Sequence, residues 1–176
     1  LYIYIYLLMD KFIKKIPESI RQGVFFGLNS GVITTTGLIA GISQTVKNPV
    51  YIIIAVVSLA ISDGFSEAYG LYISKKAEKI QDDSHEPLYA FASLLLTKGL
   101  IVLSFLIPFI FSSKLKYFKN LYWPILWGMT ILFVLDLNLS IIRKENMLMY
   151  FVPHVFILVI VCLLSRFFSK YLLKME

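Results

Sequence analysis

Residues 48–74 read NPVYIIIAVVSLAISDGFSEAYGLYIS. A run this long and this apolar reaches the ~20 residues that a helix needs to cross the hydrocarbon core of a bilayer. It also contains two acids, Asp63 and Glu67, spaced one helical turn apart and therefore on one face of a helix. Because a carboxylate inside a membrane is costly, the stretch predicts both a spanning helix and a partner that neutralises its acids.

The composition of the whole chain agrees with a membrane protein. The 176 residues are 58% hydrophobic and 16% charged, whereas a soluble domain is about half apolar and about a quarter charged. The net charge of +6 fits Lys and Arg side chains at lipid headgroups. A basic stripe interleaved with exposed aromatic residues is missing from the sequence, so nucleic acid is not an expected partner.

Four further apolar runs resemble the first, and the links between them are short. The sequence therefore predicts an all-α fold in one membrane domain, residues 1–176, with five transmembrane helices preceded by a short amphipathic helix at the membrane surface. The surface helix is expected over residues 10–21. The spans are expected over residues 23–45, 49–74, 87–111, 121–142 and 147–168. A signal peptide is not expected, because the charges of the first residues follow the apolar stretch instead of preceding it. A slight excess of Lys and Arg on the N-terminal side favours a cytoplasmic N-terminus.

Small residues form a stripe along the first expected span. At alternating spacings of four and three, every position on this face is small, and Gly31 extends the spacing of the first two glycines. The stripe consists of Gly23, Gly27, Ser30, Thr34, Gly37 and Gly41. Small stripes let membrane helices approach closely, so this one predicts either packing inside one bundle or the self-association face of a homodimer, or both.

Three kinds of partner could neutralise Asp63 and Glu67. A divalent metal ion could bind them together with oxygen ligands from Asn29 and Ser30. Lys98, in the middle of the third expected span, could pair with them instead. Protons alone could also neutralise them, and the carboxylates would then form a relay. A buried ion pair that only fixes helix register remains an alternative to a functional site.

Other polar residues predict less. The acidic link over residues 75–86 could capture a metal ion but has the composition of a solvated connector. Asp136 and His154 are interpreted as ordinary polar residues near helix ends. Phosphate-loop, zinc-protease and nucleophile-elbow motifs are missing from the sequence, so an enzyme is not expected, nor is a permanently bound cofactor.

The first span reads FGLNSGVITTTGLIAGIS, from Phe26 to Ser43. It resembles a motif of the vacuolar iron transporter family, F-G-x-N-D-G-x-x-x-T-x-G-L-x-A-G. The second span is similar to that family's A-G-A-x-S-M-A-x-G-E-Y-x-S. Matching positions in the two motifs are Phe26, Gly27, Asn29, Gly31, Thr35, Gly37, Leu38, Ala40, Gly41, Ser66, Ala68, Gly70, Tyr72 and Ser74.

The resemblance implies a homodimeric five-helix transporter that moves Fe²⁺ or Mn²⁺ out of the cytosol in exchange for protons. The chain would be a divergent, short, prokaryotic-type member in a cell membrane, without the family's long cytoplasmic metal-binding segment. The family's aspartate is replaced by Ser30, its methionine by Glu67 and its glutamate by Leu71, whereas Asp63 and Lys98 are additions. The acids have therefore moved along the second helix.

The leading hypothesis is proton-coupled transport of a divalent metal ion. Asp63, Glu67 and Asn29 are the expected metal ligands, with Ser30 and Lys98 in the same ion-coupling set. Two alternatives remain, a non-transporting membrane scaffold in which Asp63, Glu67 and Lys98 form a locked charge cluster, and a transporter of another small solute.

Overall fold

The structure, a computed structural model, describes residues 16–46, 48–78, 85–107 and 122–175. Within these residues the chain is helical, and five helices are long and apolar enough to cross a membrane. The helices are α2 (Glu18–Ile42), α3 (Pro49–Glu78), α4 (Glu86–Ser104), α7 (Tyr122–Arg143) and α8 (Leu148–Leu173). The prediction of an all-α fold with five transmembrane helices is confirmed.

The start of α2 differs from the expected boundary. Pro17 has φ −50° and ψ 142°, and the helix begins at the next residue, Glu18. Proline ahead of a helix has no N–H to leave unsatisfied, and an acid in the first turn interacts favourably with the helix dipole. Residues 18–21, assigned by the sequence to a separate surface helix, therefore belong to the first span. Residues 10–15 of that surface helix lie outside the described residues.

The other spans differ from their predicted bounds mainly at their C-terminal ends. Helix α3 continues past the apolar run to Glu78, and α8 continues to Leu173. Lys75 and Lys170 lie in these last turns, where basic side chains favour the helix dipole and can reach the headgroups. Helix α4 instead ends at Ser104, followed by a turn at residues 105–106. The predicted part of this span beyond residue 107 lies outside the described residues.

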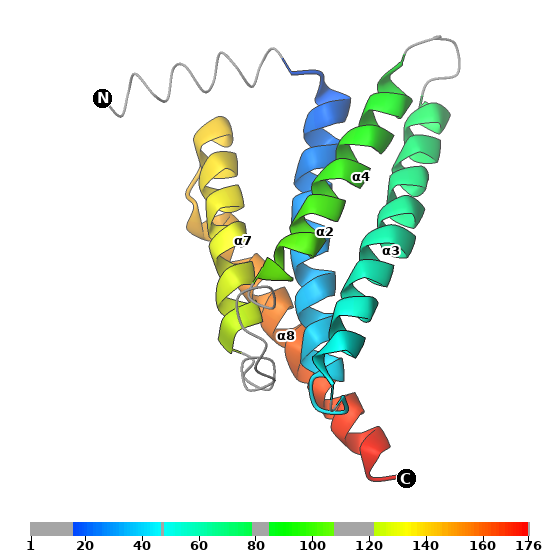
Figure 1. Ribbon diagram of the computed structural model, residues 1–176. Coiled ribbons are helices and arrows are strands. Elements are labelled where there is room, and N and C mark those ends of the chain that lie inside the picture. Colours follow the sequence, from blue (N-terminus) through cyan, green and yellow to red (C-terminus); the bar gives the residue numbers. More distant parts are fainter. Residues whose placement is uncertain (1–15, 47, 79–84, 108–121, 176) are drawn as a thin grey trace.

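Helix α2 packs against all the other spans. Helix α4 lies along α2 and also along α3, while α8 crosses α2 nearer its C-terminal end (Figure 1). Side-chain hydrogen bonds also join helices across the bundle. Ser169 Oγ donates to the Gly41 carbonyl at 2.7 Å, and Trp127 Nε1 donates to Ser104 Oγ at 3.0 Å.

The glycines of α2 allow these close approaches within one chain. A Cβ added at Gly23 would lie 2.7 Å from the Ala90 carbonyl oxygen of α4, and one added at Gly37 would lie 2.5 Å from Val161 Cγ1 of α8. Gly41 faces Ser165 of α8 in the same way. The described structure therefore uses the small stripe for packing inside the bundle, and this packing covers the glycines at positions 23, 27, 31 and 37.

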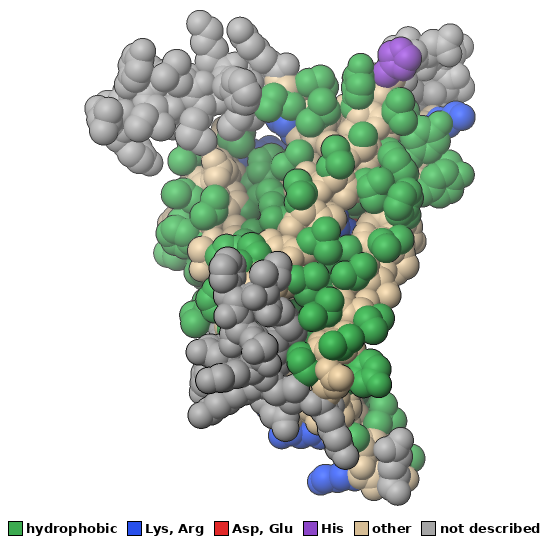
Figure 2. All heavy atoms as spheres, in the orientation of Figure 1, with side chains coloured by type: hydrophobic (Ala, Val, Ile, Leu, Met, Phe, Trp, Pro, Cys, Tyr) green, Lys and Arg blue, Asp and Glu red, His purple; other side chains and the backbone are tan. Residues whose placement is uncertain are grey.

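The outside of the bundle is apolar, as a bilayer requires. Figure 2 shows hydrophobic side chains over α3 and α4, with Lys and Arg side chains mainly near the two ends of the molecule. Large side chains such as Leu100 and Leu163 are 70% and 62% exposed. Other apolar residues, among them Val32, Val56 and Leu158, form the buried core. Contact with the lipid bilayer accounts for the exposed apolar surface.

Helices α7 and α8 are joined by a tight turn. Lys144 has φ 57°, the left-handed conformation, and the Glu145 N–H donates to the Ser140 carbonyl at 3.1 Å. The turn reverses the chain at once, so α7 and α8 run antiparallel (Figure 1).

Candidate ion-binding site

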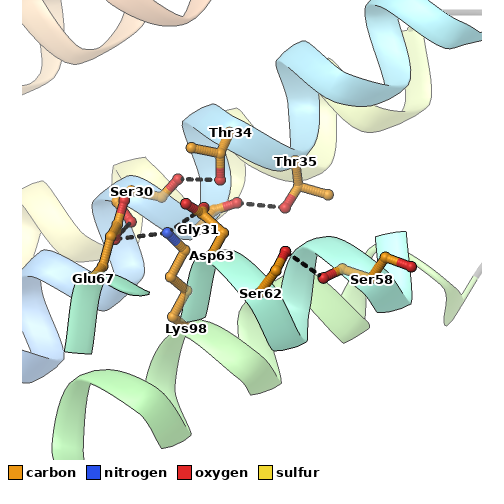
Figure 3. Close-up of polar contacts among 9 residues, drawn as sticks. All are labelled: Ser30, Gly31, Thr34, Thr35, Ser58, Ser62, Asp63, Glu67 and Lys98. Carbon is orange, nitrogen blue, oxygen red and sulfur yellow. Dashed lines mark hydrogen bonds and ion pairs between the residues drawn. The ribbon is translucent and has the colours of Figure 1, made fainter. Parts of the chain in front are cut away.

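A lysine and two carboxylates meet where α4 lies beside α3. Lys98 Nζ lies 2.5 Å from Asp63 Oδ2 and 2.6 Å from Glu67 Oε2. The two acids are one turn apart on α3, so one ammonium group reaches both (Figure 3). Of the three partners that the sequence allowed, the structure therefore places Lys98 beside the acids.

Helix α2 contributes a hydroxyl group to the same cluster. Ser30 Oγ donates a hydrogen bond of 2.5 Å to Glu67 Oε2, the oxygen that also faces Lys98 (Figure 3). One turn further on, Thr34 Oγ1 donates to the Ser30 carbonyl at 2.8 Å. The cluster of Ser30, Asp63, Glu67 and Lys98 thus joins three spanning helices.

Close packing of α2 on α4 brings Lys98 to this position. A Cβ at Gly27 would lie 3.1 Å from the Lys98 backbone nitrogen, and a Cβ at Gly31 would lie 3.5 Å from Lys98 Cγ. Larger residues at these glycines would push α4 away from α2. The small stripe and the charge cluster are therefore parts of one arrangement.

The burial of the three charges is unequal. The Lys98 side chain is 0% exposed, whereas those of Asp63 and Glu67 are 29% and 25% exposed. With both acids ionised, two negative charges face one positive charge, so the cluster keeps one net negative charge. Within the described residues the ammonium makes ion pairs but no well-aligned hydrogen bond. The cluster can accept one more positive charge through its partly exposed carboxylates.

Asn29, predicted as a metal ligand, is not part of this cluster. Its side chain lines a cavity of about 780 Å³ next to Leu71. Its Oδ1 is buried and has no hydrogen-bond partner among the described residues. Adjacent residues on a helix point in different directions, which explains why Ser30 reaches Glu67 and Asn29 does not.

A ready-made metal centre is missing from the part of the chain that the structure describes. No group of three or more His, Cys, Asp or Glu side chains there is arranged to hold a metal ion. Residues 79–84 of the acidic link over residues 75–86 lie outside the described residues. A divalent ion at Asp63 and Glu67 would have to displace the Lys98 ammonium.

One polar pair was not predicted from the sequence. Asp136 Oδ1 of α7 lies 2.7 Å from His154 Nδ1 of α8, and the Asp136 side chain is 0% exposed. The short link between these helices was the available signal, because two residues equally far from a tight turn lie at one depth in an antiparallel pair.

Residues 20–88 match the model of the VIT family. This match supports membership of the VIT family, the vacuolar iron transporters. The match includes α2, α3 and the first residues of α4, and so contains Ser30, Asp63 and Glu67 but ends before Lys98. Neither the curated proteins nor the solved structures gave a significant match to the chain.

The VIT family is a family of transporters and not of enzymes, and it indicates membrane transport of metal ions. The five apolar helices and the family together identify an integral membrane protein in contact with lipid. The segment that matches the family supplies the two acids, and the helix after it supplies their cation.

Proposed function

We propose that this chain transports divalent metal ions of the Fe²⁺ and Mn²⁺ class, exporting them from the cytosol in exchange for protons. The observation that carries the proposal is the pair Asp63 and Glu67, which lies in the family segment and holds a cation, the Lys98 ammonium, inside the membrane. Two carboxylates that bind one cation can bind another of higher charge.

Lys98 acts in this mechanism as a tethered competitor. When no metal is present, its ammonium occupies the acids and limits the cost of their burial. An arriving divalent ion takes Asp63 and Glu67 and adds the Ser30 hydroxyl, while Lys98 gives up its ion pairs. Protons that reach the carboxylates release the metal. Asn29 lies on the cavity side of α2 and meets the ion before or after the cluster.

The functional unit in this proposal is a homodimer. Helix α3 lies at one edge of the bundle (Figure 1) and carries a row of exposed small residues at every fourth position. Exposed hydroxyl groups favour contact with another helix over contact with lipid. The row runs beside the partly exposed acids and consists of Ser58, Ser62, Ser66, Gly70 and Ser74. A second copy placed on this row would cover the acids from the lipid.

The proposed location is the cell membrane of a prokaryote with a cytoplasmic N-terminus. The excess of Lys and Arg at the N-terminal end of the bundle supports this orientation. At that end, α2 begins and α7 ends, and Arg21 and Arg143 lie there.

Metal uptake into proteoliposomes tests the proposal. Vesicles that contain a Mn²⁺-quenched dye and the wild-type chain should show Mn²⁺-dependent quenching that responds to a pH gradient. The double variant Asp63→Asn with Glu67→Gln should abolish it. Glu78→Gln is the matched control, since it removes a carboxylate from the exposed end of the same helix. Wild-type rates in the double variant would refute the assignment of these ligands.

A second function is supported by the complete burial of Lys98. A fixed cluster of this kind suits a membrane scaffold that transports nothing. The variant Lys98→Met separates the two functions. If Lys98 competes with metal, the variant should bind Mn²⁺ more tightly than the wild-type chain does. If the cluster is a lock, the variant should only lose stability. Transport of another small solute remains the outcome if vesicles take up a different cation but not Mn²⁺.

A further inference from the structure

A fully buried acid lies apart from the charge cluster, between α7 and α8. The Asp136 side chain is 0% exposed, and its Oδ1 lies 2.7 Å from His154 Nδ1. Its other oxygen, Oδ2, is buried without a hydrogen-bond partner among the described residues. Neither residue belongs to the Asp63, Glu67 and Lys98 cluster.

The histidine of this pair borders a cavity large enough to hold water. His154 is 18% exposed and lines the cavity of about 780 Å³ at the end of the bundle where α2 begins. Helix α3 contributes only Leu71 to this lining. Among the described residues, the charged groups that line the cavity come from α2 and α7 and are Glu18, Arg21 and Arg143. Since Glu18 and Arg143 are exposed, the cavity connects His154 with the surface of the bundle.

The net charge of the Asp136 and His154 pair determines whether it holds a proton. An ionised Asp136 beside a neutral imidazole would leave one net negative charge at a fully buried position in the membrane. One proton removes this charge, either on the ring as imidazolium or on the carboxyl group. The pair offers a nitrogen and an oxygen 2.7 Å apart, between which this proton can be shared.

We propose that Asp136 and His154 form a second proton-binding site, which exchanges one proton with water in the cavity lined by Arg21 and Arg143. Loading forms one N–H or O–H bond with a proton from the cavity and changes the net charge of the pair from negative to zero. Unloading returns the proton to the cavity. The site does not depend on which solute the chain carries.

Nuclear magnetic resonance of labelled histidine tests the proposal without metal or transport. The chain has two histidines, His85 and His154, so ¹⁵N-histidine labelling gives two sets of ring signals, and His154→Gln assigns them. The protein is held in detergent or nanodiscs and titrated between about pH 5 and pH 9. Infrared difference spectra over the same range detect a protonated carboxyl group.

We expect the proton of the pair at about pH 7 in one of two forms. Either His154 is imidazolium and becomes neutral in Asp136→Asn, or a carboxylic-acid band is present and disappears in Asp136→Asn. The signal should respond to external pH and should survive in Asp63→Asn. Three results would overturn the proposal. The first is that the wild-type chain shows neither form, and the second is that the signal does not respond to external pH. The third is that Asp63→Asn and Asp136→Asn have equal effects. His85 is the internal control for an exposed ring.

Discussion

Lys98 Nζ lies 2.5 Å from Asp63 Oδ2, although the two residues come from different helices and the lysine is inaccessible to solvent. The contact holds α4 on α3 by charge, in a setting where apolar side chains gain little by leaving lipid for protein. Several measurable consequences follow from this contact and from the packing around it.

Removing the cation should destabilise the bundle. In Lys98→Met we expect the free energy of unfolding to fall by about 3 kcal/mol, because Asp63 and Glu67 remain without a cation. This loss of unfolding free energy is near the lower end of the range for breaking a buried ion pair, since both acids are partly exposed and can take up protons. Denaturation in detergent micelles measures it. The triple variant that also carries Asp63→Asn and Glu67→Gln should regain most of the stability, and no regain would contradict the ion-pair account.

Restoring the family's aspartate at position 30 should strengthen metal binding. In Ser30→Asp a third carboxylate would lie beside Glu67, which already accepts the Ser30 hydroxyl. We expect about tenfold tighter Mn²⁺ binding, because divalent affinity rises with the number of charged oxygen ligands. The melting temperature as a function of Mn²⁺ concentration measures it. Ser30→Asn is the uncharged control, and equal Mn²⁺ responses of the two variants would count against a metal site here.

The packing of α2 on α4 should not tolerate a methyl group at Gly23. A Cβ there would lie 2.7 Å from the Ala90 carbonyl and 2.9 Å from the Leu94 nitrogen, both backbone atoms. We expect Gly23→Ala to cost about 1–3 kcal/mol of unfolding free energy. Gly99→Ala is the matched control, since no atom lies within 4 Å of its added Cβ. The control should be neutral or slightly stabilising, and a similar loss in both would refute the packing argument.

The row of exposed small residues on α3, Ser58 to Ser74, should face a second copy of the chain. The single cysteine, Cys162, is buried, so Cys162→Ser provides a background for new thiols. In that background we expect Ser66→Cys to form a disulfide-linked dimer in membranes under mild oxidation. Leu163→Cys, on the exposed side of α8, should remain monomeric on the same gel. Equal cross-linking at both positions would argue against a specific dimer face.

The turn between α7 and α8 should gain from glycine. Lys144 has φ 57°, a conformation that costs an L-residue roughly 1–2 kcal/mol and costs glycine nothing. Glycine loses more chain entropy on folding, and this offsets part of the relieved strain. Lys144→Gly should therefore raise the unfolding free energy by about 0.5 kcal/mol. Thermal unfolding measures the gain. Lys144→Ala should show no increase, because alanine keeps the Cβ that causes the strain.

The sequence predicted the fold well because a bilayer allows few solutions. Each apolar run must satisfy its own backbone hydrogen bonds, so run length alone predicted the five spans. The family was also identifiable, because the α2 motif matches at closely spaced positions. Helix ends were harder to predict. Lys75 and Lys170 continue their helices beyond the apolar core, where hydropathy no longer determines the boundary.

The side-chain partners could be predicted only in part. The costly charges were visible in the sequence, and Lys98 was one of three partners considered for Asp63 and Glu67. The rotation of a helix about its axis decides which of its side chains faces a neighbouring helix. In α2 this rotation brings Ser30, and not Asn29, to Glu67. The pairing of Asp136 with His154 depends on the register of two helices across the Lys144 turn. The short link in the sequence indicates only that the two residues lie at a similar depth, and the register itself depends on the geometry of the turn.

The buried lysine of α4 also constrains how the protein is made. A lone helix with a lysine at its centre enters the bilayer at a penalty of about 2.5–3.5 kcal/mol. Helix α4 is therefore expected to leave the translocation machinery together with α3, whose acids are already in place when it emerges. Biosynthesis from the N-terminus presents α3 first, so the order of synthesis delivers the counter-charge before the residue that needs it.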